Sequence, residues 1–265
     1  MFYGRSFIFD GISSEIYNLY INDLSDGSPV KVAGSSGLEV YEEKVYRKSI
    51  PYYFGGTESP KLSYEFSCFS EQEIDANTAG LIQKWLFGQR SYKKFQVDQI
   101  DSIPYYINGL FNSPQVNKVG NLIRGFSATL EANAPFAFSF PQTISQTYDS
   151  SVVTDQIIFN NSSDDASDYL QPILTIIMNS SGGGITITDV EDNSRVTSFT
   201  GLQPYEIITV DSYLQTVSSN TGLKRLNNFN KNFLRLLPNK NSLQIQGNIA
   251  VISLTYVFAS RSLVG

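Results

Sequence analysis

Histidine is absent from this 265-residue sequence, cysteine and tryptophan each occur once, and charged residues make up only 17% of the chain. A single cysteine allows no disulfide within the chain. Without histidine and with one cysteine, the chain cannot form a Cys/His zinc cluster or use an imidazole as a catalytic base. Most common catalytic and metal-binding designs are therefore excluded, and we expect a protein that is not an enzyme and binds neither a metal ion nor a cofactor.

The charge balance argues against a nucleic-acid partner. The sequence has 19 Lys and Arg against 25 Asp and Glu, a net charge of −6, and the basic residues do not gather in one stretch. Concentrated positive charge is what binds a phosphate backbone, so we expect no sequence-specific nucleic-acid binding. The longest apolar tract, IAVISLTYVFA at 249–259, is interrupted by Ser253 and Thr255 and is too short to span a bilayer, so no membrane partner is expected.

The abundant residues favour strands. Phe occurs 18 times, Tyr 16 times and Gly 19 times, a composition typical of a mainly β protein. The length is large for one hydrophobic core and comfortable for two. The segment APFAFSFPQTISQTYDSSVVTDQ at 134–156 mixes aromatic with polar residues and is marked by Pro135 and Pro141, as expected of a connector that leads into a second domain. We therefore predict two β-sandwich domains, at 1–139 and 140–265.

Strand patterns recur in both halves. In KLSYEFSCF at 61–69, apolar residues alternate with polar ones and Cys68 falls on the apolar side, which predicts a half-buried strand and a buried thiol. FSATLEA at 126–132 repeats the alternation. After Ile157, short strands and turns alternate as in a sandwich, and SSGGGITI at 180–187 predicts a glycine hairpin turn, since no helix follows to hold a phosphate.

One segment has helical spacing, which predicts a single α-helix at about 70–87 that ends at Gly88. Ser70 and Glu73 have the spacing of a capping box at its start. A lone Trp could be a stacking platform for a sugar or a base, but this one shares its face with aliphatic residues, so we interpret it as a core anchor. The predicted core face consists of Ile74, Leu81, Ile82 and Trp85.

A charged segment at 29–54 is predicted to form a hairpin, although its apolar and polar residues do not alternate regularly. Such a hairpin could project and contact another subunit, or it could be an ordinary solvated edge whose charges block aggregation. The candidate oligomer contacts are Glu42, Glu43, Lys44, Arg47 and Lys48.

Two acidic loops could bind calcium through their carboxylate oxygens. They contain Asp164, Asp165 and Asp168 in one case and Asp189, Glu191 and Asp192 in the other, but neither has the spacing or the Gly of an EF-hand. A carboxylate pair for glycoside hydrolysis needs two side chains on one face, and the adjacent Glu42 and Glu43 would point to opposite faces of a strand.

Several segments occur in an order that matches a known family. They are FYGRSFIFDGISSEIYNLYI at 2–21, ESPKLSYEFSCFSEQEID…IQKWLFGQRSYKKFQV at 58–97, and YYINGLFNSPQV…GFSATLEANAPFAF at 105–138. LPNKNSLQIQG at 237–247 occupies the place of a Pro-Gly-Asn turn, with Lys240 where Gly is usual. In pattern and order the chain resembles the distal tail proteins (Dit) of bacteriophages with long, non-contractile tails.

The resemblance implies a structural virion protein at the tail tip. Its N-terminal domain would assemble into a homohexameric ring and its C-terminal domain would be a galectin-like sandwich. The ring would link the tail tube to the adsorption apparatus and leave a channel for the genome. The implied partners are other copies of the chain, the tail tube protein, a tail-tip or tail-associated fibre protein and a receptor-binding protein, with assembly in the host cytoplasm.

Two other classes remain open from the residues alone. The aromatic-rich β composition also fits a carbohydrate-binding module or lectin that recognises host cell-wall glycans, and a glycan hydrolase is a third reading. Mass in solution separates a tail-tip ring protein from a carbohydrate-binding module, because a ring-forming protein is an oligomer whereas a binding module is often a monomer.

Overall fold

The computed structural model describes residues 6–21, 38–46, 50–58, 63–97, 105–134, 136–149, 152–164 and 169–260. The chain divides into two compact units, Phe140–Ala259 and a first unit that combines Met1–Ser139 with Ser260–Gly265. Strand β20 (Ala259–Ser260) joins β10 (Ala137–Ser139), which places Ser260 with the first unit.

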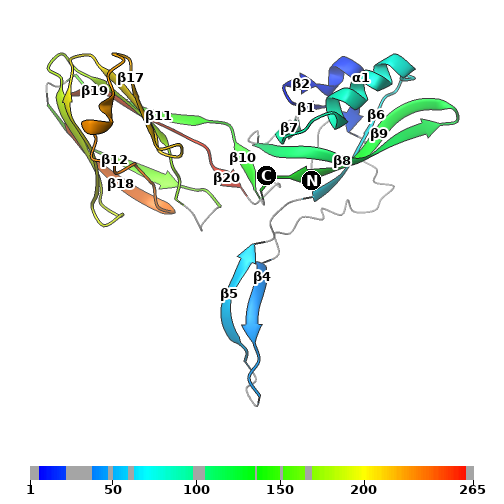
Figure 1. The fold of residues 1–265 in the computed structure, drawn as a ribbon, viewed down its shortest axis with the longest axis horizontal. Helices are drawn as coiled ribbons and strands as arrows, with labels where there is room; N and C mark the ends of the chain where they lie inside the picture. Colours follow the sequence, from blue (N-terminus) through cyan, green and yellow to red (C-terminus); the bar gives the residue numbers. More distant parts are fainter. Residues whose placement is uncertain are drawn as a thin grey trace. The chain divides into compact units, whose positions relative to one another are not determined.

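The first unit is built on one hydrogen-bonded sheet in the order β2-β1-β7-β8-β9-β6-β3, with β10 paired to β8 (Figure 1). Tyr64, Phe66 and Cys68 of β6 are buried and face Leu130, Ala128 and Phe126 of β9 in antiparallel register, as the alternation predicts. A short 3-10 helix, η1, spans Ser14–Tyr17. The remaining strands are β1 (Phe7–Phe9), β2 (Ile12–Ser13), β3 (Tyr20–Ile21), β6 (Ser63–Phe69), β7 (Lys93–Val97), β8 (Tyr105–Val119) and β9 (Leu122–Ala132).

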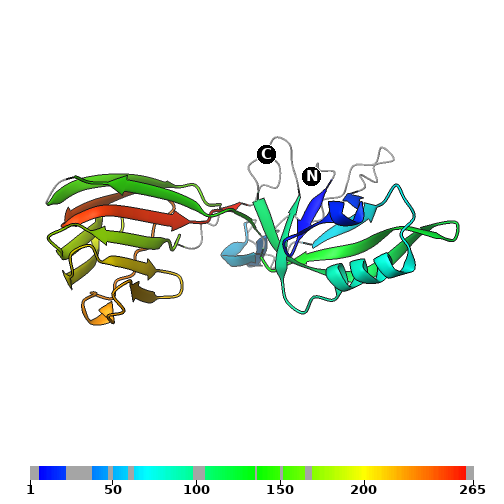
Figure 2. The same ribbon diagram turned by 90° about the horizontal axis from the view of Figure 1, so that it is seen from above.

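The helix α1 spans Ala76–Phe87 and lies along β8 (Figure 2). Its N-cap is Asp75, whose Oδ1 accepts hydrogen bonds from the backbone N–H groups of Asn77 and Thr78 at 2.8 and 3.0 Å. The predicted Ser70–Glu73 capping box is therefore wrong.

The later helix start has a tertiary cause. The backbone N–H groups of Ser70 and Ile74 donate to the carbonyl oxygens of Arg124 and Ile123, at 2.7 and 3.0 Å. These contacts hold the chain beside β9, so it begins to coil only after Ile74. Gly88 is the C-cap, and its N–H donates to the carbonyl oxygen of Lys84.

Three of the four residues predicted for the core face are buried, namely Ile74, Ile82 and Trp85, but Leu81 is 56% exposed. Placing Leu81 in the core was wrong. Ala79, Ile82 and Leu86 mark the centre of the buried face, and Leu81 is turned about 100° from Ile82 around the helix axis. Trp85 lies at the edge of this face and reaches the core because its side chain is long.

The hairpin of β4 (Leu38–Glu43) and β5 (Tyr52–Glu58) forms a two-stranded sheet of its own, which we call the arm (Figure 1). Its strands pair antiparallel, with Glu42 opposite Tyr53 and Glu43 opposite Tyr52. The register shifts between Val40 and Glu42, so Tyr41 sits at an irregularity.

The second unit is a sandwich of a five-stranded sheet, β11-β19-β13-β16-β17, and a four-stranded sheet, β12-β18-β14-β15. Its core contains Leu174, Ile176, Leu243 and Leu254, each at most 1% exposed. The strands are β11 (Gln142–Thr147), β12 (Val153–Asn161), β13 (Ile173–Met178), β14 (Gly183–Asp189), β15 (Arg195–Leu202), β16 (Ile207–Asp211), β17 (Thr216–Ser219), β18 (Asn239–Gly247) and β19 (Ile249–Tyr256), with a 3-10 helix, η2, at Arg225–Asn227.

The glycine turn expected at 180–187 leads into β14. Gly182 has φ +60, and an added Cβ would lie 2.7 Å from the carbonyl oxygen of Leu202. Both its backbone conformation and the space around it therefore favour glycine. Cys68 in the first unit is a buried free thiol, as expected. Among the described residues no helix has the length and apolar character needed to cross a membrane.

A buried ion pair ties together the loops next to β16. The Glu206 side chain is fully buried and accepts hydrogen bonds from Arg225 Nε at 2.7 Å and Nη2 at 2.6 Å. The same carboxylate accepts from the Gln203 N–H and the Ser219 hydroxyl. A single side chain thus joins three segments that are separate in sequence.

Acid should weaken the second unit through Glu206. Burial raises the pKa of this carboxyl, but hydrogen bonds from Arg225, Gln203 and Ser219 outweigh burial and lower the pKa from 4.5 to about 2. A depressed pKa in the folded state gives a contribution that is complete above pH 4.5 and is lost as the pH falls toward 2. We expect the urea midpoint of the second unit to fall across this window, with a shallower dependence in Glu206→Gln. An equal pH dependence in both proteins would contradict this assignment.

Candidate functional site

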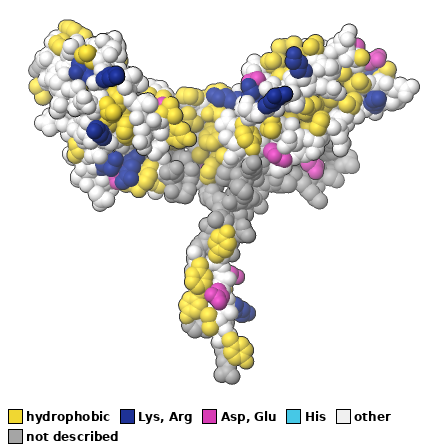
Figure 3. Space-filling view, viewed as in Figure 1, with side chains coloured by type: hydrophobic (Ala, Val, Ile, Leu, Met, Phe, Trp, Pro, Cys, Tyr) yellow, Lys and Arg dark blue, Asp and Glu magenta, His cyan; other side chains and the backbone are white. Residues whose placement is uncertain are grey.

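The arm exposes apolar side chains along its length (Figure 3). Tyr46 is 86% exposed, Ile50 79% and Phe54 68%, and Tyr41 and Tyr52 are about half exposed. Large exposed apolar patches on folded proteins mark interaction surfaces. The arm therefore has the composition of a contact element.

The charged residues predicted as oligomer contacts are only part of this surface. Glu42, Glu43 and Lys44 are exposed on the arm, while Arg47 and Lys48 lie outside the described residues. The sequence reasoning missed the aromatic residues, although VYEEKVYRKSIPYYF at 40–54 contains them. The available signal was an aromatic run in a segment without core alternation.

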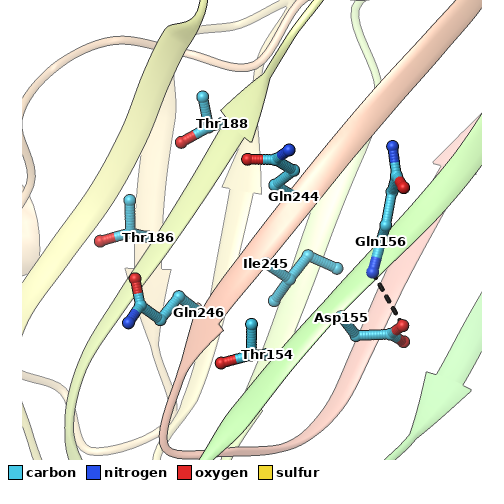
Figure 4. Close-up of a pocket in the computed structure, with 8 residues that line it drawn as sticks. All are labelled: Thr154, Asp155, Gln156, Thr186, Thr188, Gln244, Ile245 and Gln246. Carbon is cyan, nitrogen blue, oxygen red and sulfur yellow. Dashed lines mark hydrogen bonds between the residues drawn. The ribbon is translucent and has the colours of Figure 1, made fainter.

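A second candidate surface is a groove of about 510 Å³ on the four-stranded sheet (Figure 4). Cross-strand register forms its two polar rows. The first is Thr154–Gln246–Thr186 and the second is Gln156–Gln244–Thr188. Each row takes one residue from β12, β18 and β14. No sequence window shows this grouping, because the three strands are far apart in the chain.

In these rows the β12 and β18 residues are exposed and Thr186 and Thr188 are half-buried, so the rows present amide and hydroxyl groups at the surface of the sheet. The groove also contains Asp155, whose Oδ2 accepts from the Tyr148 hydroxyl at 3.0 Å, and the buried Ile245. Its lining has no aromatic ring on which a sugar could stack. Chemically, the two rows offer neutral donors and acceptors, and the groove adds one carboxylate, Asp155.

The acidic loops do not assemble a metal site within the described part of the chain. Asp192 is held by Arg235, and the Glu191 carboxylate accepts from Ser242 Oγ at 2.7 Å. Burial raises the pKa of Asp189 to about 6. Asp164 is described, but its sequence neighbours Asp165 and Asp168 are not.

Two solved structures from bacteriophages have a fold similar to that of this chain. The Dit protein of phage SPP1, described as a hub of the adsorption apparatus in phages infecting Gram-positive hosts, has a TM-score of 0.68 at 10% identity, over 96% of this chain and 98% of that chain. A chain of the phage P2 baseplate in its activated conformation with Ca has a TM-score of 0.54 at 9% identity, over 97% and 99%. At such low identity the likeness shows a shared fold alone.

Comparison of sequences gives the family directly. No curated protein matches the chain at a significant level. A family model described as a phage tail protein N-terminal domain matches residues 2–134, and one described as a phage tail C-terminal domain matches 136–256. Together they cover nearly the whole chain and meet at residue 135. The chain therefore belongs to the phage tail protein family that these two domain models define.

Proposed function

We propose that this phage tail protein is the hexameric hub at the distal end of the tail. In this role it joins the tail tube protein to a tail-tip or fibre protein and to a receptor-binding protein, and it leaves a channel for the genome. It is assembled in the host cytoplasm and has no catalytic role. The fold shared with the SPP1 hub protein supports the position in the tail, and the apolar arm is the observation that supports assembly.

A closed ring needs one patch of each subunit to meet a different patch of the next. The arm suits one half of such a contact, because its strands pair only with each other among the described strands. Its exposed rings would lose water contact on a neighbouring subunit, which favours association at roughly 25 cal/mol per Å² of buried apolar area. Glu42, Glu43 and Lys44 would then set orientation at the rim of the contact.

We expect the purified protein to form a hexamer, measured by light scattering coupled to size exclusion. The variant Tyr46→Ser with Phe54→Ser should dissociate it, since both rings are exposed on the arm. Tyr213→Ser is the matched control, because Tyr213 is 75% exposed but belongs to the second unit. A monomer at all micromolar concentrations, with and without added tail partners, would rule out the ring.

The second unit is proposed as a docking surface for other tail proteins, with the Thr and Gln rows as its contact groups. The alternative is a carbohydrate-binding module, which the polar groove alone would favour. We expect no saturable binding when the full chain is titrated with monosaccharides or cell-wall glycan fragments, because the groove lacks an aromatic ring. A dissociation constant tighter than about 1 mM in calorimetry would support the carbohydrate-binding alternative.

A further inference from the structure

A separate pocket of about 520 Å³ lies wholly within the second unit. Tyr169 contributes to it from before β13, Arg195 from the start of β15, Leu226 from η2, and Lys231 and Arg235 from the segment that follows η2. The pocket thus gathers three cationic side chains from two distant parts of the chain. This grouping is notable in a protein with a net charge of −6.

One carboxylate positions two of these cations. Arg235 donates to Asp192 through Nε at 2.7 Å and Nη2 at 3.0 Å, and Arg195 Nε lies 3.9 Å from the same carboxylate. The Arg235 guanidinium also stacks on the Tyr169 ring at 4.1 Å. The Arg235 guanidinium is therefore held in place before any ligand arrives, and the Arg195 guanidinium lies beside the same carboxylate.

The pocket has a surplus of positive charge. Among the described residues Lys231 makes no ion pair, and Asp192 is the acidic partner of the two arginines. Asp189 lies opposite Arg195 in the β14–β15 register, and its Oδ1 accepts from the Glu191 N–H. The three cations exceed these two carboxylates by one charge, and a net positive charge suits a phosphate monoester, which carries roughly −1.5 to −2 at neutral pH.

Two buried polar groups also point to a binding site. Arg195 Nε and the Ser212 hydroxyl are buried at the pocket wall without a hydrogen-bond partner among the described residues, and such groups are commonly satisfied by water or an ion.

We propose that this pocket binds the phosphate group of a small organic phosphate. Arg195 and Arg235 would contact the phosphate oxygens through N–H groups not used by Asp192, since planar guanidinium groups match phosphate geometry. Lys231 would supply the remaining charge. The organic part would lie against Leu226, which is 47% exposed, and Phe233 on the pocket wall. This site is independent of ring assembly and of the Thr and Gln rows.

Calorimetric titration of the full chain at constant ionic strength tests the proposal with three probes: phenyl phosphate, inorganic phosphate and acetate. Phenyl phosphate should bind saturably and more tightly than inorganic phosphate, because its ring covers the apolar wall. Acetate should bind at least tenfold more weakly than inorganic phosphate, because it carries only one charge. Absence of saturable binding by both phosphates would overturn the proposal.

Two matched variants test the position of the site. Lys231→Gln should weaken phenyl phosphate binding about tenfold, equivalent to 1.4 kcal/mol at 25 °C. Lys118→Gln removes an exposed lysine from β8 of the first unit and should leave binding unchanged. Equal weakening by both variants would indicate general charge attraction and overturn the pocket assignment. Tight binding of a short DNA duplex without binding of phenyl phosphate would likewise overturn it.

Discussion

Replacing Trp85 by alanine should lower the free energy of unfolding of the first unit by about 3–5 kcal/mol, the usual cost of deleting a large core aromatic. Trp85 is 5% exposed, and its ring is stacked on Phe7 with centroids 5.7 Å apart. Its Nε1 also donates to the carbonyl oxygen of Phe9 at 2.9 Å. The substitution therefore leaves both a cavity between helix and sheet and an unpaired carbonyl on β1.

Leu81→Ala is the matched control, because Leu81 lies on the same helix but is 56% exposed. It should change stability by no more than about 0.5 kcal/mol, as is usual for surface substitutions. Calorimetry and hydrogen exchange can measure both variants, whereas fluorescence is lost with the only Trp. If Trp85→Ala melted like the parent protein, Trp85 would not be a core anchor. Loss of ligand binding without loss of stability would instead make it a recognition residue.

Arg225→Met should destabilise the second unit by about 3–5 kcal/mol, because it leaves a buried carboxylate without its counter-charge. Glu206 is fully buried and the Arg225 side chain is 8% exposed. Two of the hydrogen bonds that Glu206 accepts come from Arg225. Urea denaturation monitored by hydrogen exchange should show that the loss of stability is centred on β16 and β17.

The Lys93–Asp10 pair provides the comparison. Its atoms are 3.2 Å apart, but the side chains are 30% and 38% exposed. Lys93→Met should therefore cost at most about 1 kcal/mol, as is typical of exposed ion pairs. Trp85 fluorescence should report an unchanged first unit in Arg225→Met. Equal effects of the two substitutions would show that burial does not govern the Glu206–Arg225 pair.

Local patterns in the sequence were sufficient for much of the fold. The alternation at 61–69 predicted β6 and buried Cys68, because side chains on a strand alternate between its two faces. The 3.6-residue period placed Ile82 and Trp85 on the buried face of the helix. Composition alone indicated a mainly β protein, because the chain is rich in Phe and Tyr, which favour strands, and in Gly, which disfavours helices.

Tertiary contacts decided the features that local patterns missed. The helix starts after Asp75 because the backbone before it bonds to β9. The Thr and Gln rows exist because β12, β18 and β14 pair in one register. The cationic pocket joins Arg195 to Lys231 and Arg235. Hydrophobic period reports on neighbouring residues, and composition reports on the chain as a whole. These contacts instead join particular segments that are distant in sequence, and only the folded chain determines which of them meet.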